Sequence, residues 1–452
     1  MTTSMSIPAI KGAPLLGNMQ AFRNDRLNLY LNVNRTCGDI GSFRVGRQQI
    51  ILVTSADLVQ TILVDHAADF EKSPILRYFG GPVLGNGLLT SENEFHKRQR
   101  KLIAPAFQHR RISGYADIMA SYSEQLQQPW QTGETIDVAH EMMRLTLWIV
   151  GKTLFDTDVL TEAEDVGDAL TEAMLSFNAK ISSPIPTPLT WPTPQNRRFF
   201  NAVKRLDDII YHIIQKRRES TDDHGDLLSI LLQSHYEDDG SFMTDQQVRD
   251  EVMTLFLAGH ETTANAMAWS WYLLTQNPVV YTRLREEVDR VLAGRTPTTD
   301  DLPNLPYTLQ VLKEAMRLYP PAHMISRQAQ RDLTIAGYQI PAGTIVAISP
   351  YAIHRRSDYF PDPERFDPER WTPEHEEQLP RHAYMPFGGG PRVCIGNHFA
   401  MMEGQIILAT LAQRTKFTLA ADQRVEPETL ATLRPRNGIK MTVERRETSH
   451  SA

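Results

Sequence analysis

One cysteine of this chain stands in a setting that suits a metal-binding thiolate. Cys394 lies in Phe387–Gly396, a segment with four glycines and one arginine, directly ahead of an apolar helical pattern over 399–411. Free N–H groups and the dipole at the start of that helix are expected to lower the thiol pKa. Glycines let the backbone approach the sulfur and a flat ligand, because no Cβ intervenes. We expect Arg392 to reach an anionic group of that ligand.

The chain has only one other cysteine, Cys37, so a disulfide framework is excluded. We interpret Cys37 as a small apolar residue at a helix end. A buried structural cysteine is the commoner fate of a lone cysteine, and Cys394 alone leaves that alternative open. A thiolate as the one protein ligand of haem iron, however, favours O–O cleavage, and this chemistry needs no second cysteine.

An acid and an alcohol are adjacent within a long apolar segment, where polar groups are costly to bury without partners. Glu261 and Thr262 follow the small residues Ala258 and Gly259. The Thr262 hydroxyl can bond back to a carbonyl one turn earlier, and the small residues leave space for a diatomic ligand. Glu261 could relay the protons that dioxygen reduction consumes. Without the cysteine segment, a simple helix kink would be the favoured interpretation.

Five positions match the cysteine-loop signature of the cytochrome P450 superfamily: Phe387, Gly390, Arg392, Cys394 and Gly396. The segment 258–263 resembles the family's Ala/Gly-Gly-x-Asp/Glu-Thr motif. The resemblance implies that Cys394 holds the iron of haem b, that Thr262 steadies the bound oxygen species and that Glu261 feeds protons. It also implies contacts of the cofactor with Ala258, Gly259, Phe387 and Gly396.

Further charged residues match family motifs. Glu314 and Arg317, one helical turn apart, would contribute only about 0.2–0.5 kcal/mol as an exposed pair. They resemble the family's Glu-x-x-Arg motif, and Arg370 fits the later arginine that completes it. The resemblance implies a buried network that anchors the loop of Cys394, so its role is structural.

The haem propionates need cationic or hydrogen-bonding partners. His96 and Arg100, four residues apart, resemble the family's aromatic-x-x-x-Arg pattern, with His in the aromatic position. Arg327 and Arg392 complete the expected set. Three nearby basic residues fall on other helix faces, where we expect them to be solvated or to dock an acidic electron donor: Lys97, Arg98 and Lys101.

The element pattern predicts a mainly helical protein with a small β-region. A hairpin is predicted near the N-terminus and three short strands after residue 321, at 40–45, 49–53, 333–335, 338–340 and 344–348. Amphipathic helices are predicted over 138–154 and 199–216, with a proline-rich apolar loop over 182–197 between them. The longest helix is predicted over 244–276, with a capping box formed by Thr244 and Gln247. The family resemblance implies the triangular helical prism around haem, with 1–452 as a single haem domain and no fused reductase.

The net charge of −7 over 452 residues argues against a nucleic-acid or anionic-membrane binder. We recognise neither a signal peptide nor a membrane anchor, and we expect a cytoplasmic monomer.

The resemblance implies hydroxylation or epoxidation of a hydrophobic small molecule, such as a fatty acid, terpenoid or polyketide. It implies electrons from a ferredoxin or flavodoxin with an NAD(P)H-dependent reductase. The substrate-access regions are expected at 75–89 and 182–197. Two alternatives stay open: a peroxide-driven member of the same superfamily, and a haem protein for electron transfer or gas sensing.

Overall fold

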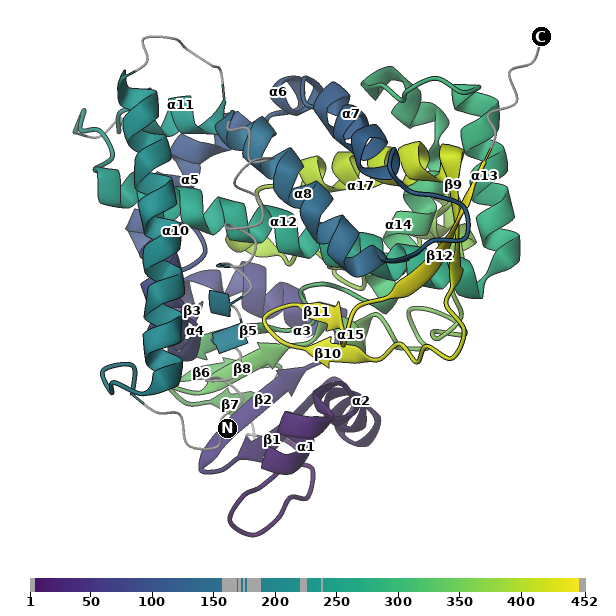
Figure 1. Ribbon diagram of the computed structural model, residues 1–452. Helices are drawn as coiled ribbons and strands as arrows, with labels where there is room; N and C mark the ends of the chain where they lie inside the picture. The colour runs from purple at the N-terminus through teal and green to yellow at the C-terminus, as the bar shows by residue number, and fades with distance from the viewer. Residues whose placement is uncertain are drawn as a thin grey trace.

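The structure is a computed structural model that describes residues 5–156, 169, 172–173, 175–176, 188–219, 226–236 and 239–446. Helices dominate it (Figure 1). Their bounds are α1 Met19–Asn24, α2 Arg26–Cys37, α3 Ala56–Gln60, α4 Pro74–Leu84, α5 Asn93–Ile103, α6 His109–Ser113, α7 Ala116–Gln127, α8 Val138–Phe155, α10 Pro194–Glu219, α11 Leu227–Gln233, α12 Asp245–Gln276, α13 Pro278–Leu292, α14 Pro306–Leu318, α15 Pro350–Ile353, α16 Pro373–Glu376 and α17 Asn397–Arg414. The mainly helical fold class is confirmed.

The strands form small sheets, and the largest of them lies at one end of the molecule, below the helices in Figure 1. Its order is β1-β2-β8-β5-β3, from strands Ile40–Val45, Gln48–Val53, Ile345–Ile348, Ile325–Ala329 and Phe70–Lys72. A second sheet has the order β4-β12-β9, from Thr135–Asp137, Lys440–Arg445 and Thr415–Leu419. Two hairpins pair β6 with β7 and β10 with β11, at Leu333–Ile335, Tyr338–Ile340, Pro427–Thr429 and Leu433–Pro435.

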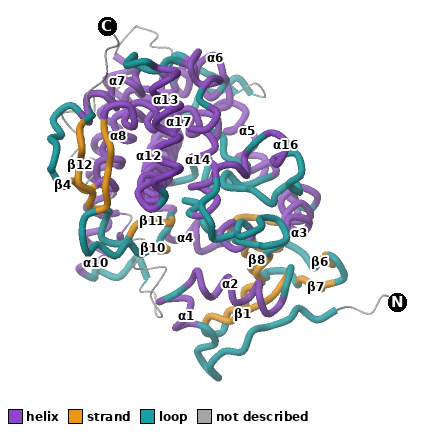
Figure 2. The backbone as a smooth tube through the Cα atoms, turned by 90° about the vertical axis from the view of Figure 1, so that its right-hand side faces the viewer, coloured by secondary structure: helices purple, strands orange, loops and turns teal. Residues whose placement is uncertain are grey.

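The helix α12 runs through the helical part of the molecule, as both views show (Figures 1 and 2). Its 32 residues would span about 48 Å. The predicted capping box is confirmed, because the Thr244 side chain accepts from the Gln247 N–H at 3.2 Å and Gln247 accepts from the Thr244 N–H at 2.8 Å. Most of α12 is buried among the residues of the main hydrophobic core, so few of its side chains meet solvent.

Several smaller predictions are confirmed, but the predicted end of the apolar loop at residue 197 is wrong. The hairpin of β1 and β2, the helix α8 and the helical end before Pro320 are observed. Cys37 is the last residue of α2 and is half-buried. The apolar loop predicted over 182–197 lies outside the described residues up to 187, and the helix α10 already begins at Pro194, which suits proline because a first-turn residue needs no N–H partner.

No described helix combines the length and the hydropathy that a membrane span requires.

Candidate active site

The loop that carries Cys394 is held by its backbone. The Cys394 N–H donates to the carbonyl of Phe387 at 3.0 Å, which closes the loop on itself. Gly390 has φ +67°, and a Cβ on it would lie 1.8 Å from the Leu63 carbonyl oxygen, so glycine is required there. Gly396 is the N-cap residue of α17 and places the cysteine two residues ahead of that helix. The sequence interpretation of a thiol at a helix start is confirmed.

The electrostatics of the thiol differ from the expectation. Burial among protein atoms raises the pKa of the Cys394 thiol and outweighs the lowering by the Gly396 N–H and by the charge of Arg100. The helix start therefore does not make this cysteine a thiolate by itself, and the prediction of a lowered pKa is wrong for the protein alone. The Cys394 side chain nevertheless keeps exposed surface, so a ligand can reach it. A metal ion bound there would deprotonate the thiol.

A second exposed surface is found on α12, although this helix runs through the centre of the fold. Ala258 is exposed and Thr262 is half-buried, although most of their neighbours on this central helix are buried. The Thr262 hydroxyl donates to the Ala258 carbonyl at 2.7 Å, as predicted from the sequence. Ala258 and Cys394 are thus two exposed surfaces that a ligand could cover.

The acid next to Thr262 points elsewhere. Glu261 is buried, and the Thr432 hydroxyl donates to its Oε1 at 2.7 Å. Asn265 donates to the same Thr432 hydroxyl at 3.1 Å. Burial raises the pKa of Glu261, partly offset by the Thr432 bond and by the charge of Arg434. Adjacent helix residues differ by about 100° in direction, so the Thr262 and Glu261 side chains occupy different faces of α12.

Positive charges gather beside this space. Burial and the charge of Arg392 lower the pKa of His96 to about 3, so its imidazole is neutral. The charges of Arg100 and Arg327 contribute to the same shift, which shows that these predicted residues lie close together. Burial and Arg392 likewise lower the pKa of Arg327 to about 10. The structure thus brings together all four residues predicted to hold the propionates.

Lys72 belongs to the same cluster and was missed by the sequence analysis. It lies opposite Arg327 across the paired strands β3 and β5. Burial, Arg392 and Arg327 lower its pKa to about 7. The three-residue strand β3 gives no sequence signal for this placement, because the pairing with β5 joins segments more than 250 residues apart.

One carboxylate offsets part of this charge. Glu92 pairs with Arg392 and accepts from the Lys72 backbone N–H at 2.8 Å. Arg392 also donates to the Ser91 carbonyl at 2.6 Å. The basic side chains still outnumber the carboxylates Glu92 and Glu71, whose charges both act on Arg392, so the cluster fits a dianionic group such as a pair of haem propionates.

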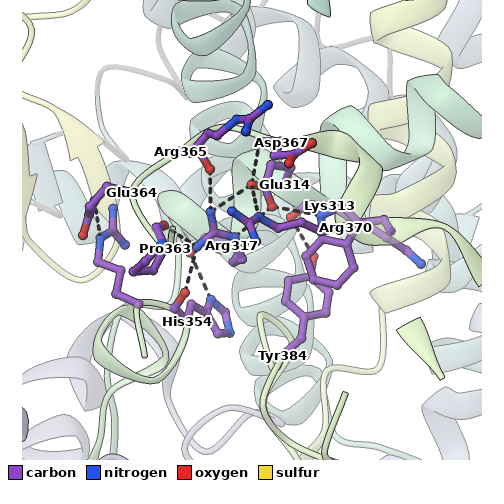
Figure 3. Close-up of polar contacts among 12 residues, drawn as sticks. Lys313, Glu314, Arg317, His354, Pro363, Glu364, Arg365, Asp367, Arg370 and Tyr384 are labelled. Atoms are coloured by element: carbon purple, nitrogen blue, oxygen red, sulfur yellow. Dashed lines mark hydrogen bonds and ion pairs between the residues drawn. The ribbon is translucent and has the colours of Figure 1, made fainter. Parts of the chain in front are cut away.

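The predicted network of Glu314, Arg317 and Arg370 is confirmed (Figure 3). Glu314 and Arg317 are fully buried and joined by two bonds of 2.8 Å. Arg317 also donates to three carbonyls, at distances of 2.7 to 3.1 Å: those of His354, Pro363 and Arg365. The Arg370 Nε lies 3.4 Å from a Glu314 oxygen, and Trp371 donates to the other oxygen at 3.0 Å.

His354 connects this network to the cysteine loop. Its Nδ1 bonds to the Arg317 carbonyl at 3.1 Å, and its Nε2 accepts from the Met385 N–H at 2.9 Å. Burial and the charge of Arg317 lower the pKa of His354 to about 3, so the ring stays neutral. A neutral ring can donate from Nδ1 and accept at Nε2. Met385 lies two residues before the loop that begins at Phe387, so the network holds the start of the segment that carries Cys394. Sequence analysis missed His354 because no motif marks it.

Lys97 and Lys101 are exposed, as expected, and Lys97 forms an ion pair with Glu94 at 2.6 Å. Arg98 forms an ion pair with Asp239 at 2.7 Å. His260 is buried, and its Nδ1 lies 3.1 Å from the Phe256 carbonyl, which gives it a structural role.

The geometry can be compared with known proteins. The family model described as Cytochrome P450 matches residues 8–443. The chain belongs to the cytochrome P450 family. Cyclooctatin synthase of Streptomyces melanosporofaciens is 37% identical to it over 92% of this chain and 91% of that protein. Pentalenene oxygenase of Streptomyces avermitilis is 34% identical over 88% of each chain.

The fold agrees with solved structures of the family. The crystal structure of the cytochrome P450DA heme domain matches with a TM-score of 0.89 and 26% identity, over 98% of this chain and 99% of that one. Family membership makes the protein a haem-thiolate monooxygenase that oxidises a hydrophobic organic substrate. It implies a haem iron cofactor and a redox partner.

Proposed function

We propose that Cys394 would supply the thiolate that holds a haem b iron, and that Phe387, Gly396, Ala258 and Gly259 would line the haem. The observations that carry this are the exposed surface of Cys394 in the loop ahead of α17 and the exposed surface of Ala258 on the mostly buried helix α12. Non-covalent haem b is favoured because covalent c-type attachment needs a cysteine pair, and Cys37 lies in another part of the fold. When bound, the haem supplies the activation of dioxygen.

The propionates are assigned to His96, Arg100, Arg327 and Arg392, with Lys72 as a fifth partner. This assignment is supported by their mutual electrostatic effects and by the surplus of positive charge over Glu92. Neutral His96 donates a ring N–H, and the others supply charge-assisted bonds.

Thr262 and Glu261 are assigned to proton handling. Thr262 borders the exposed surface of Ala258, so its hydroxyl can hold a water molecule or the oxygen substrate in position. Glu261 would take part only after its side chain leaves Thr432 and turns across the helix. Its raised pKa suits a group that carries a proton.

We infer that the electron donor is an acidic ferredoxin or flavodoxin, served by an NAD(P)H-dependent reductase, and that the chain is a monomeric single haem domain in the cytoplasm, where that cofactor is supplied. Exposed basic side chains lie on and after α5, namely Lys97, Lys101, Arg110 and Arg111. Phe107, between these residues, packs 3.6 Å from the Cβ position of Gly396. This basic surface therefore neighbours the cysteine loop, which suits electron transfer from an acidic partner.

The substrate class we favour is the terpenoids, because relatives are named for cyclooctatin, cyclooctat-9-en-7-ol and pentalenene. An apolar groove between α4 and the start of α10 suits the entry of such a molecule, and it is lined by Pro82, Leu189, Trp191 and Phe200. Pro82, Leu189 and Trp191 belong to the two regions predicted for substrate access, and Phe200 lies just beyond the second region.

The ligand assignment is tested by Cys394→Ala. We expect this change to abolish the thiolate-type absorption of the reduced carbon monoxide complex, because no other sulfur of the described site can replace it. Cys37→Ala is the matched control and should leave the spectrum unchanged. An unshifted Soret band in Cys394→Ala would remove the assignment.

The role of Thr262 is tested by Thr262→Ala, which should divert electrons from product to hydrogen peroxide and lower coupling roughly 10-fold or more. Thr262→Ser keeps the hydroxyl and should restore coupling. Wild-type coupling in the alanine variant would end the proposed role. The same assay with added peroxide distinguishes the peroxide-driven alternative, which predicts turnover without a reductant.

A further inference from the structure

The face of α12 that carries Thr262 continues towards the N-terminus with two more polar residues. Glu251, Thr254, Ala258 and Thr262 are spaced by three, four and four residues, which places them along one side of the helix. Thr254 is one turn before Ala258, about 6 Å along the axis. The polar stripe therefore ends at the exposed surface described above.

Glu251 and Thr254 are buried under the loop that follows α4. The Leu88 N–H donates to Glu251 Oε2 at 2.9 Å. A Cβ on Gly87 would lie 2.2 Å from the Thr254 Oγ1, so only glycine allows the loop to pack this closely. Yet Glu251 Oε1 and Thr254 Oγ1 are buried without a hydrogen-bond partner. Unsatisfied oxygens of this kind are rare in native proteins and commonly bind internal water.

A third such atom lies on α5. Gln99 Oε1 accepts from the Tyr236 hydroxyl at 2.8 Å, but Gln99 Nε2 is buried without a partner. The charge of Glu251 acts on Tyr236, which places the two side chains within electrostatic range. The Arg98 guanidinium lies 3.6 Å from the Tyr236 ring centroid, and 31% of its side chain is exposed. The polar groups around Glu251 thus extend through Tyr236 to Arg98, near the protein surface.

We propose that internal water molecules bind to Gln99, Glu251 and Thr254, and that Glu251 passes protons along them from the Tyr236 side to Thr262. In each cycle the Glu251 carboxyl gives a proton to the water on its Thr254 side, and that water passes one on towards Thr262. The carboxylate then regains a proton from the water on its Gln99 side. One proton moves inward, and the carboxyl group is unchanged.

This inference rests on the proposed function, since it needs a proton-consuming reaction beside Thr262. It assigns the delivery to an acid whose Oε1 has no hydrogen-bond partner, whereas both the burial and the bond of Glu261 to Thr432 hold that side chain in place. Burial raises the pKa of Glu251 to about 8, with a smaller contribution from Asp250, so the group holds a proton near neutral pH and can still release it. Tyr236 is a further titratable group within electrostatic range of Glu251.

The hydration is tested by infrared spectroscopy of the haem-loaded protein and by its crystal structure. We expect a protonated-carboxyl band that shifts in D2O and is lost in Glu251→Gln, a variant that still accepts the Leu88 N–H. We also expect ordered water within hydrogen-bonding distance of Glu251 Oε1 and Thr254 Oγ1. Asp250→Asn is the matched control and should keep the band. The absence of ordered water at Glu251 Oε1 and Thr254 Oγ1, or a carboxyl band that persists in Glu251→Gln, would overturn the proposal.

The proton transfer is tested by coupling. Glu251→Gln should slow the proton-dependent step roughly 100-fold, the low end for a positioned acid. Thr254→Val should act in the same direction with a smaller effect. Unchanged coupling in Glu251→Gln together with loss of coupling in Thr262→Ala would reject this route and leave the proposed function intact. If neither Glu251→Gln nor Thr262→Ala loses coupling, both this route and the proposed role of Thr262 are rejected.

Discussion

Two buried charged clusters adjoin the cysteine loop, and they are built differently. In one cluster, each charge of Glu314 and Arg317 meets an opposite charge, a carbonyl or an N–H of the protein itself. In the other cluster, burial lowers the pKa values of Lys72 and Arg327, and the charge of Arg392 lowers both further, because the nearby carboxylates do not balance the basic groups. A network that is satisfied within the chain maintains the fold, whereas a cluster with surplus charge needs a ligand.

Breaking the satisfied network should have the largest effect on stability. Arg317→Ala would leave Glu314 buried without its main counter-charge, and we expect a loss of about 3–5 kcal/mol in the free energy of unfolding. Urea unfolding followed by circular dichroism measures this. Lys313→Ala, on the same helix, breaks a partly exposed pair with Glu376 and should cost less than about 1 kcal/mol. Equal losses in the two variants would contradict the comparison.

A change in the basic cluster of Lys72, Arg327 and Arg392 should weaken haem binding and leave the stability of the haem-free protein intact. Arg327→Ala should weaken haem retention by roughly 10- to 100-fold, from the loss of a charge-assisted bond of about 1.5–3 kcal/mol. The haem-free protein should be no less stable than the wild type, because repulsion with Arg392 and Lys72 is relieved. Transfer of haem to apomyoglobin measures retention. Arg331→Ala removes an exposed arginine nearby and is the control. A destabilised haem-free variant with normal haem retention would show that Arg327 belongs to the scaffold.

The smallest expected effect is the pH dependence of the haem-free protein. The pKa of Lys72 is about 7 in the folded chain and near 10.5 in the unfolded chain. Between these values the unfolded chain binds more protons, so stability should rise with pH from 7 to 10. One pKa unit corresponds to about 1.4 kcal/mol, so we expect a slope of up to about that size per pH unit, which Lys72→Met should remove. Thermal unfolding across this pH range measures it, and the same slope in both proteins would exclude Lys72 as its source.

Much of the site could be predicted from local sequence. The segment around Cys394, the back-bonded Thr262 and the Glu314–Arg317 pair each lie within a few residues of the atoms that define them. Backbone preferences and helical spacing act over that range, so their geometry follows from the sequence. The cap of α12 and the β1–β2 hairpin are local for the same reason.

Only the tertiary structure decided where the remaining polar groups point. Glu261 turns to Thr432, 171 residues away, although its motif suggested the space beside Thr262. Lys72 joins the basic cluster through strand pairing with β5, and His354 reaches the cysteine loop through a bond to Met385. Such contacts depend on which distant segments pack together, and the energy of burying a polar group depends on the partner it finds there. No local pattern contains that information.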